Sequence, residues 1–135
     1  MSRDSFHTDR EILQCVFDIY RASYLGDRGE TGKLENSVYL SIDLAEVATR
    51  LNTDSHLLFG RLYYSMDKKH RYTQDDGRKV HLFAPVVGSE RNCVNFPYLT
   101  AILAEQRQEN WKYRLTLTLS IAAVILSIIG LVIKR

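Results

Sequence analysis

Cysteine is scarce in this 135-residue chain, and the two that it has, Cys15 and Cys93, stand far apart and form no CxxC pair. This excludes a disulfide framework and a cysteine-based metal motif, and two isolated cysteines are typical of a reducing compartment. The N-terminus is polar and lacks the apolar core of a signal peptide. A linker rich in proline, glycine or serine is also lacking, as is an internal repeat. We therefore expect one small domain that is not exported.

Catalytic patterns are lacking as well. The four histidines stand in no recognisable motif, and none is paired at a known spacing with a nucleophile and a carboxylate. The paired carboxylates Asp75 and Asp76 fall where a turn is expected, and Asp is ordinary turn chemistry. His70 and His81 can face each other across a hairpin, but no third zinc ligand is evident. We predict a protein that is not an enzyme and that uses neither a metal nor another cofactor.

The C-terminal end carries a long apolar run. Residues 115–133 are 19 consecutive uncharged positions, followed by Lys134 and Arg135. As a helix this run is roughly 28 Å long, about the hydrocarbon thickness of a bilayer. A buried core helix is a poor alternative, because a chain of this size has no core that could bury a helix apolar on all sides. The run predicts a single transmembrane helix.

The flanks of this run indicate its orientation. Trp111 and Tyr113 precede it, where an interfacial aromatic belt is expected, and Arg107, Lys112 and Arg114 lie on the same side. Because positive charge favours the cytoplasmic side, this bias agrees weakly with the missing signal peptide. We expect a tail anchor in the cell inner membrane, with a single pass and the N-terminal domain in the cytoplasm.

One face of the run carries small or weakly polar residues at spacings of 4, 3, 4 and 3. Membrane helices associate through such residues, and a period of 3.5 favours a left-handed pair or small bundle. Chance composition is the alternative, since these residues are common in membrane spans. The pattern predicts a homo-oligomer that associates through this small stripe. The small stripe consists of Thr116, Ser120, Ala123, Ser127 and Gly130.

Charge is balanced in total but uneven along the chain. Residues 1–60 hold 10 acidic and 6 basic side chains, whereas residues 61–91 hold 4 acidic and 7 basic ones. The formal net charge of +2 equals the contribution of Lys134 and Arg135. The domain is therefore dipolar and not polycationic, which weakens the case for non-specific nucleic-acid binding.

Local signals set an order of elements before the apolar run. Thr8 with Glu11 and Asp43 with Glu46 read as capping boxes, and Asp-Gly at 76–77 is a strong hairpin signal. Pro85 is expected to end the second hairpin strand, before a polar loop. In order, the signals predict a helix over 9–24, a glycine loop over 26–32, a strand over 37–41, a helix over 44–51, a turn at 52–53, a helix over 54–69, hairpin strands over 71–74 and 78–84, and a helix capped by Asn95 that runs unbroken into the span.

This order resembles a winged helix-turn-helix domain over about residues 8–87. The resemblance implies an α+β fold with a winged-helix domain over 1–95, a connecting helix over 96–114 and a transmembrane helix over 115–133. The tract FGRLYYSMDKKHRYTQDDGRKVHLFAP also resembles a segment of uncharacterised bacterial proteins. Membrane-bound winged-helix regulators are similar in layout, but they carry an external sensor after the span, where this sequence has two residues.

The outward face of the helix over 54–69 is the candidate contact surface. It offers Leu57, Gly60, Arg61 and Tyr64, and it lacks the Asn and Gln side chains that read adenine. Such an apolar and aromatic patch is more typical of a protein contact than of base reading. A solvated helix with a few stray apolar residues is the alternative. We predict that these four residues bind a protein partner.

Basic residues at the end of this helix and on the hairpin form a second feature, the basic rim, which can contact phosphates or anionic lipid headgroups. We therefore predict a membrane-tethered module that docks a protein partner, or itself, at the cytoplasmic face of the membrane. The alternative is a membrane-tethered DNA-binding transcriptional regulator, with weak nucleic-acid binding. The basic rim consists of Lys68, Lys69, Arg71, Arg78 and Lys79.

Overall fold

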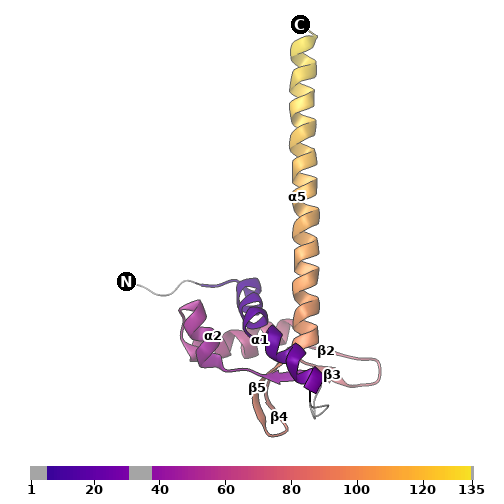
Figure 1. The fold of residues 1–135 in the computed structure, drawn as a ribbon. Helices are drawn as coiled ribbons and strands as arrows, with labels where there is room; N and C mark the ends of the chain where they lie inside the picture. The colour runs from indigo at the N-terminus through magenta and orange to yellow at the C-terminus, as the bar shows by residue number, and fades with distance from the viewer. Residues whose placement is uncertain (1–5, 31–37, 135) are drawn as a thin grey trace. The chain divides into compact units, whose positions relative to one another are not determined.

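The structure is a computed structural model that describes residues 6–30 and 38–134. The chain separates into two compact units, Met1–Leu103 and Ala104–Arg135. Together the described residues form a mixed helix-and-sheet region and a long C-terminal apolar helix, as predicted (Figure 1). The elements are α1 (Asp9–Glu30), β1 (Tyr39–Ser41), α2 (Leu44–Leu51), α3 (Ser55–Gly60), the π-helix η1 (Arg61–Asp67), α4 (Lys68–His70), β2 (Tyr72–Thr73), β3 (Lys79–Val80), β4 (Phe83–Val87), β5 (Glu90–Asn95) and α5 (Phe96–Ile133).

The strands of the first unit form two antiparallel sheets. One has three strands in the order β1-β5-β4, and in it Tyr39 pairs with Asn95 and Ala84 pairs with Cys93. The other is a ribbon of β2 and β3, in which Tyr72 pairs with Val80. The central strand β5 thus joins an early strand to the end of the domain and leads directly into α5.

One hydrophobic core holds the first unit together. It collects the apolar faces of α1, α2 and the helical stretch 55–70, one face of the sheet and the first two turns of α5. Burying each large aliphatic side chain contributes about 1.5–3 kcal/mol relative to leaving it exposed. The most deeply buried members are Leu13, Val16, Val47, Leu58, Leu62, Met66, Leu82, Phe83, Val94 and Leu99.

Two predicted helix boundaries are confirmed by their caps. The Asp43 carboxylate accepts a hydrogen bond from the Ala45 N–H at 2.9 Å, and α2 ends at Asn52, whose φ of 54° is left-handed. The Asn95 side chain accepts from the Tyr98 N–H at 3.1 Å, and α5 then continues unbroken to Ile133. These polar side chains satisfy backbone donors that a helix start leaves without partners.

The predicted end of the first helix is wrong. α1 continues to Glu30, six residues beyond residue 24, so the expected glycine loop is helical over residues 26–30. The extension includes Gly26 and Gly29, each of which costs a helix about 1 kcal/mol relative to alanine, and this cost does not end the helix. The rest of that loop, and residue 37 of the predicted first strand, lie outside the described residues; the strand itself is Tyr39–Ser41.

The strands after the Asp-Gly turn also differ from the prediction. Pro85 does not end a strand but lies inside β4, and the expected polar loop contains a turn at Gly88 and the strand β5. Proline is tolerated there because β4 is at the edge of its sheet. Gly88 has a φ of 61°, as a glycine in the first central position of a type II′ turn requires. The predicted strand over 78–84 is therefore split between two sheets.

The predicted helix over 54–69 is helical, but its middle is a π-helix. The sequence has an apolar i, i+3, i+4, i+7 pattern over this helix, which predicts that Phe59, Leu62, Tyr63 and Met66 face the core. The structure confirms that Leu62 and Met66 are buried, and Phe59 is partly buried against the core. It also buries Leu58 and Asp67, whereas Tyr63 is 38% exposed. A π-helix has more residues per turn than an α-helix, so side chains after its start point in changed directions.

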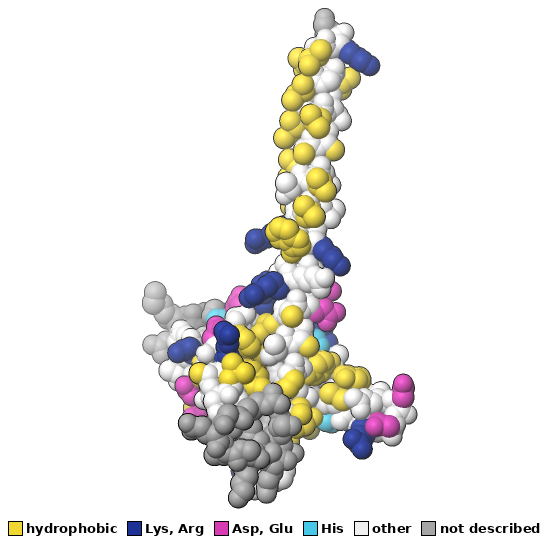
Figure 2. All heavy atoms as spheres, turned by 45° about the vertical axis from the view of Figure 1, so that its right-hand side comes forward, with side chains coloured by type: hydrophobic (Ala, Val, Ile, Leu, Met, Phe, Trp, Pro, Cys, Tyr) yellow, Lys and Arg dark blue, Asp and Glu magenta, His cyan; other side chains and the backbone are white. Residues whose placement is uncertain are grey.

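The second unit is the greater part of α5. Among the residues that the structure describes, α5 is the one helix long and apolar enough to cross a membrane. Figure 2 shows apolar side chains over the surface of this unit, with Lys and Arg toward its ends.

Candidate functional site

A groove of about 510 Å³ lies between the N-terminal segment, the end of α2 and α3. We call it the Leu57 groove. Its lining is mainly apolar and includes no Asp or Glu among the residues that the structure describes. A concave apolar surface with a few polar groups is the usual form of a binding site. The lining residues are Phe6, His7, Ile12, Leu51, Thr53, His56, Leu57, Leu58, Gly60 and Arg61.

Three of the four predicted partner-binding residues line this groove, and the fourth lies elsewhere. Leu57, Gly60 and Arg61 are lining residues, and Leu57 is 62% exposed. Tyr64 is 69% exposed and packs against Tyr63, with ring centroids 4.9 Å apart. Its ring also meets that of Phe59 edge-on at 6.5 Å. The exposed apolar surface of the helix therefore has two parts, the Leu57 groove and an aromatic cluster.

Arg61 has internal partners that the sequence did not reveal. Its Nη1 donates to the His7 carbonyl at 2.8 Å, and its Nη2 donates to Asp9 Oδ1 at 2.7 Å. With its side chain 33% exposed, Arg61 ties the N-terminal segment to η1. A partner in the groove would meet a guanidinium that is already paired.

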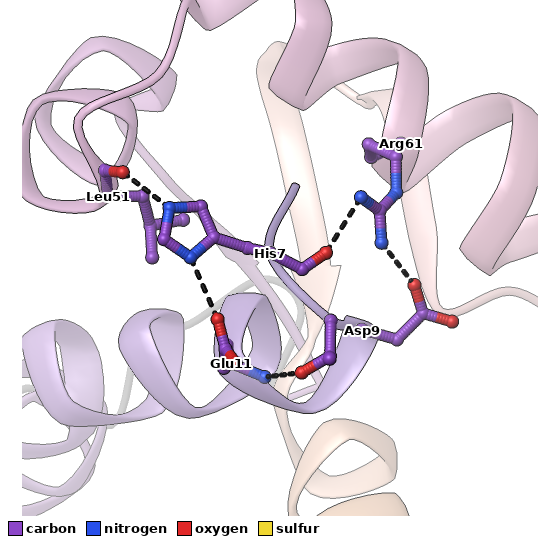
Figure 3. Close-up of polar contacts among 6 residues, drawn as sticks. His7, Asp9, Glu11, Leu51 and Arg61 are labelled. Atoms are coloured by element: carbon purple, nitrogen blue, oxygen red, sulfur yellow. Dashed lines mark hydrogen bonds and ion pairs between the residues drawn. The ribbon is translucent and has the colours of Figure 1, made fainter. Parts of the chain in front are cut away.

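His7 stands beside this tie and bridges two further elements (Figure 3). Its Nδ1 lies 2.8 Å from Glu11 Oε2 on α1, and its Nε2 lies 2.6 Å from the Leu51 carbonyl oxygen at the end of α2. The hydrogen bond to Glu11, followed by the one to Leu51, raises the pKa of His7 above its usual 6.5. The same contact with His7 lowers the pKa of Glu11. A cationic ring at a helix C-terminus is also favoured by the helix dipole.

The basic rim is exposed along its whole length. Lys69 Nζ lies 3.9 Å from Asp9 Oδ2, and Arg78 Nε lies 3.4 Å from Asp76 Oδ2. The other three rim residues make no ion pair with any described residue. Arg78 and Lys79 belong to the β2–β3 ribbon and its turn, whereas the other three lie at α4.

The small stripe is exposed along α5. The hydroxyls of Thr116, Ser120 and Ser127 donate to carbonyls four residues earlier, at 2.9 Å each. A Cβ at Gly130 would meet nothing within 4 Å. Each hydroxyl therefore donates its hydrogen bond within the helix, and its oxygen can still accept one from a neighbouring helix. Association through the small stripe stays a prediction.

Asp67 is a buried charged residue that sequence reasoning missed. It is 2% exposed, and its Oδ1 accepts from the Leu82 N–H at 2.9 Å and from the Phe83 N–H at 3.2 Å. Its Oδ2 lies 3.1 Å from Nδ1 of His81. Asp67 therefore fastens the start of β4 to the helical stretch. His7 was also missed, because it precedes the first expected helix and belongs to no pattern.

Comparison with known proteins finds no family model, no curated protein and no solved structure that matches this chain. The site must therefore be interpreted from its own chemistry. It combines apolar surface, a satisfied network of charged groups at its edge, and basic side chains on nearby elements. Such an arrangement can bind by burying apolar area and can orient a partner by charge.

Proposed function

We propose that this chain is a non-enzymatic, membrane-tethered binding module whose N-terminal domain docks a protein partner at the cytoplasmic face of the inner membrane. The observation that carries the proposal is the exposed apolar surface of one helical stretch, where Leu57 is 62% and Tyr64 is 69% exposed. Large apolar and aromatic side chains gathered beside a groove are typical of contact hot spots. The groove provides space for an apolar anchor residue of the partner.

The proposed membrane tether is the C-terminal part of α5. Its segment 115–133 is uncharged, and Trp111 and Tyr113 stand where the headgroup region would begin. A single pass with the domain in the cytoplasm agrees with the basic residues just before this segment. The small stripe would then raise the local concentration of domains by pairing their spans.

We also propose that the domain is a winged helix. The sequence of α1, β1, α2 and the helical stretch 55–70, followed by a hairpin that pairs with β1, supports this assignment. In this interpretation β4 and β5 form the wing. The β2–β3 ribbon, which contains the predicted Asp-Gly turn, is then an additional hairpin before the wing.

A membrane-tethered DNA-binding regulator is the second candidate, favoured by the exposed basic rim. Rim residues on two elements can contact phosphates of one duplex. Two observations weigh against it. Residues 1–114 have no net charge, and the helical stretch exposes Leu57 and Tyr64 where side chains that read bases would be needed.

Site-specific photocrosslinking tests the docking proposal in native membranes. The photoreactive residue p-benzoylphenylalanine replaces Leu57 or Tyr64 in the full chain, and exposed Ser89 serves as the control position. We expect protein adducts at the two helix positions that resist nuclease, and none at the control. Equal adducts at Ser89, or none at either helix position, would refute docking through this surface. Adducts that disappear with nuclease would favour the DNA-binding regulator.

A further inference from the structure

The N-terminal strap, residues 6–8, is fastened to three elements. The His7 ring contacts Glu11 of α1 and the last carbonyl of α2, and the His7 carbonyl accepts from Arg61 of η1 (Figure 3). The Thr8 carbonyl accepts from the Ile12 N–H at 3.1 Å. Two of these contacts are made by a single imidazole ring, so the ring links α1 to α2.

The protonation state of this ring decides how many contacts it makes. The Leu51 carbonyl can only accept a hydrogen bond, and an ionised Glu11 carboxylate also only accepts. Both ring nitrogens must therefore donate, which requires the imidazolium form. A neutral imidazole carries one N–H and must give up one of the two contacts.

The strap is also a wall of the Leu57 groove, because Phe6 and His7 are among its lining residues. Phe6 is 93% exposed. If the Phe6 side chain filled the groove, it would be buried. The strap therefore borders the groove and leaves it open. The fastened strap therefore completes the groove.

We propose that protonation of His7 regulates the Leu57 groove: the imidazolium holds the strap against both α1 and α2 as a wall of the groove, and loss of the proton frees the strap from one of these two helices. The proposal rests on the proposed function, in which this groove is a docking surface. The switch would make docking of a partner dependent on pH, since the partner would meet a complete groove only when His7 is charged.

Charged groups around His7 come from every element packed against it. Glu11 stabilises the imidazolium, and Asp9 neutralises Arg61, whose charge opposes it. A second cavity that His7 lines is also lined by Arg10, Asp18 and Arg50, and His56 lines the Leu57 groove together with His7. The pKa of His7 is raised and that of Glu11 is lowered, so the clamp is complete between pH 4.5 and 6.5 and is lost as the pH rises through the raised value of His7.

Nitrogen-15 NMR of the full chain in detergent micelles tests the clamp directly. We expect both His7 ring nitrogens to carry protons at pH 6, a midpoint above 6.5, and amide shifts of Thr53 and Gly60 that follow the same midpoint. Glu11→Gln should lower that midpoint. His7→Gln should abolish the transition at the two groove amides. His56→Gln, a change of the same type in the same groove, should leave it in place.

A His7 midpoint at or below 6.5, or groove amides that titrate unchanged in His7→Gln, would overturn the proposal. A second measurement separates regulation from docking. The crosslinking yield at position 57 is compared in isolated membranes across this pH range, with and without His7→Gln. We expect a loss of yield above the His7 midpoint only where His7 is present. Equal yields at all pH values overturn the regulation alone, whereas no adduct at any pH, with the His7 transition intact, overturns docking.

Discussion

Replacing Asp67 with alanine should strongly destabilise the first unit. The buried carboxylate satisfies two backbone donors, the N–H groups of Leu82 and Phe83, both of which belong to fully buried residues. Alanine leaves both donors without a partner, and each buried orphan costs about 1–3 kcal/mol. The lost contact with His81, which is 35% exposed, adds little because solvent screens it. We expect a loss of about 3 kcal/mol.

Asparagine at the same position is the matched control. Its side-chain oxygen can still accept from both N–H groups, although a neutral acceptor makes weaker bonds than a carboxylate. We expect Asp67→Asn to cost about 1 kcal/mol.

Amide hydrogen exchange of the full chain in micelles, read at Leu82 and Phe83, separates the two variants. A loss of about 3 kcal/mol corresponds to more than a hundredfold faster exchange, since about 1.4 kcal/mol is tenfold. Urea unfolding followed by tyrosine circular dichroism gives the global value. If the two variants are equally stable, or if alanine costs under about 1 kcal/mol, the carboxylate does not hold the start of β4 in the way described.

Four further predictions concern pH, topology, DNA and the membrane span. The stabilisation from the His7–Glu11 contact should be complete between pH 4.5 and 6.5. It should be lost above this range as His7 deprotonates through its raised pKa, and below this range as Glu11 protonates through its lowered pKa. His7→Gln should flatten the alkaline side of a plot of unfolding temperature against pH. A protease added outside intact cells should leave residues 1–110 whole, and their digestion would refute the tail-anchor topology. The full chain should bind duplex DNA weakly and with a steep salt dependence, and alanine substitutions in the basic rim should reduce that dependence. Nanomolar, sequence-selective binding at physiological salt would favour the DNA-binding regulator over the docking module. Leucine at the serines and the glycine of the small stripe should weaken self-association in a membrane-based assay, while leucine at Ile121, Ile125 and Ile128 should not. Equal effects at both sets of positions would show that the small stripe is not the contact face.

The elements that could be predicted are those whose ends are set by one local side chain. Asp43 and Asn52 bound α2 at the predicted residues, since a capping carboxylate and a left-handed Asn act within one turn. Asn95 starts α5 in the same way. The long apolar helix needs no tertiary information, because its composition alone gives its length and character.

The elements that could not be predicted depend on partners distant in sequence. β5 begins with polar residues and includes Asn92 at a φ of 52°, so no alternating pattern marks it as a strand. It becomes the central strand because β1 and β4 pair with it on either side. The Leu57 groove likewise depends on His7, whose contact with the Leu51 carbonyl joins residues 44 positions apart. No local signal could have placed that histidine there.

The π-helix η1 accounts for two features of the candidate site that the sequence did not predict, the burial of Asp67 and the position of Tyr64 outside the Leu57 groove. An α-helix advances about 100° per residue, which would place Asp67 about 180° from Leu58, on the solvent side. A π-helix advances about 80° per residue, so η1 brings Asp67 to about 60° from Leu58, where it can reach the buried N–H groups of Leu82 and Phe83.

The smaller advance per residue in η1 also moves Tyr64 from about 20° to about 80° away from Leu57. It also aligns Tyr63 with Phe59, and their rings stack at 5.5 Å. One change in helical register therefore buries the carboxylate that holds the sheet and divides the exposed apolar surface into a groove and an aromatic cluster.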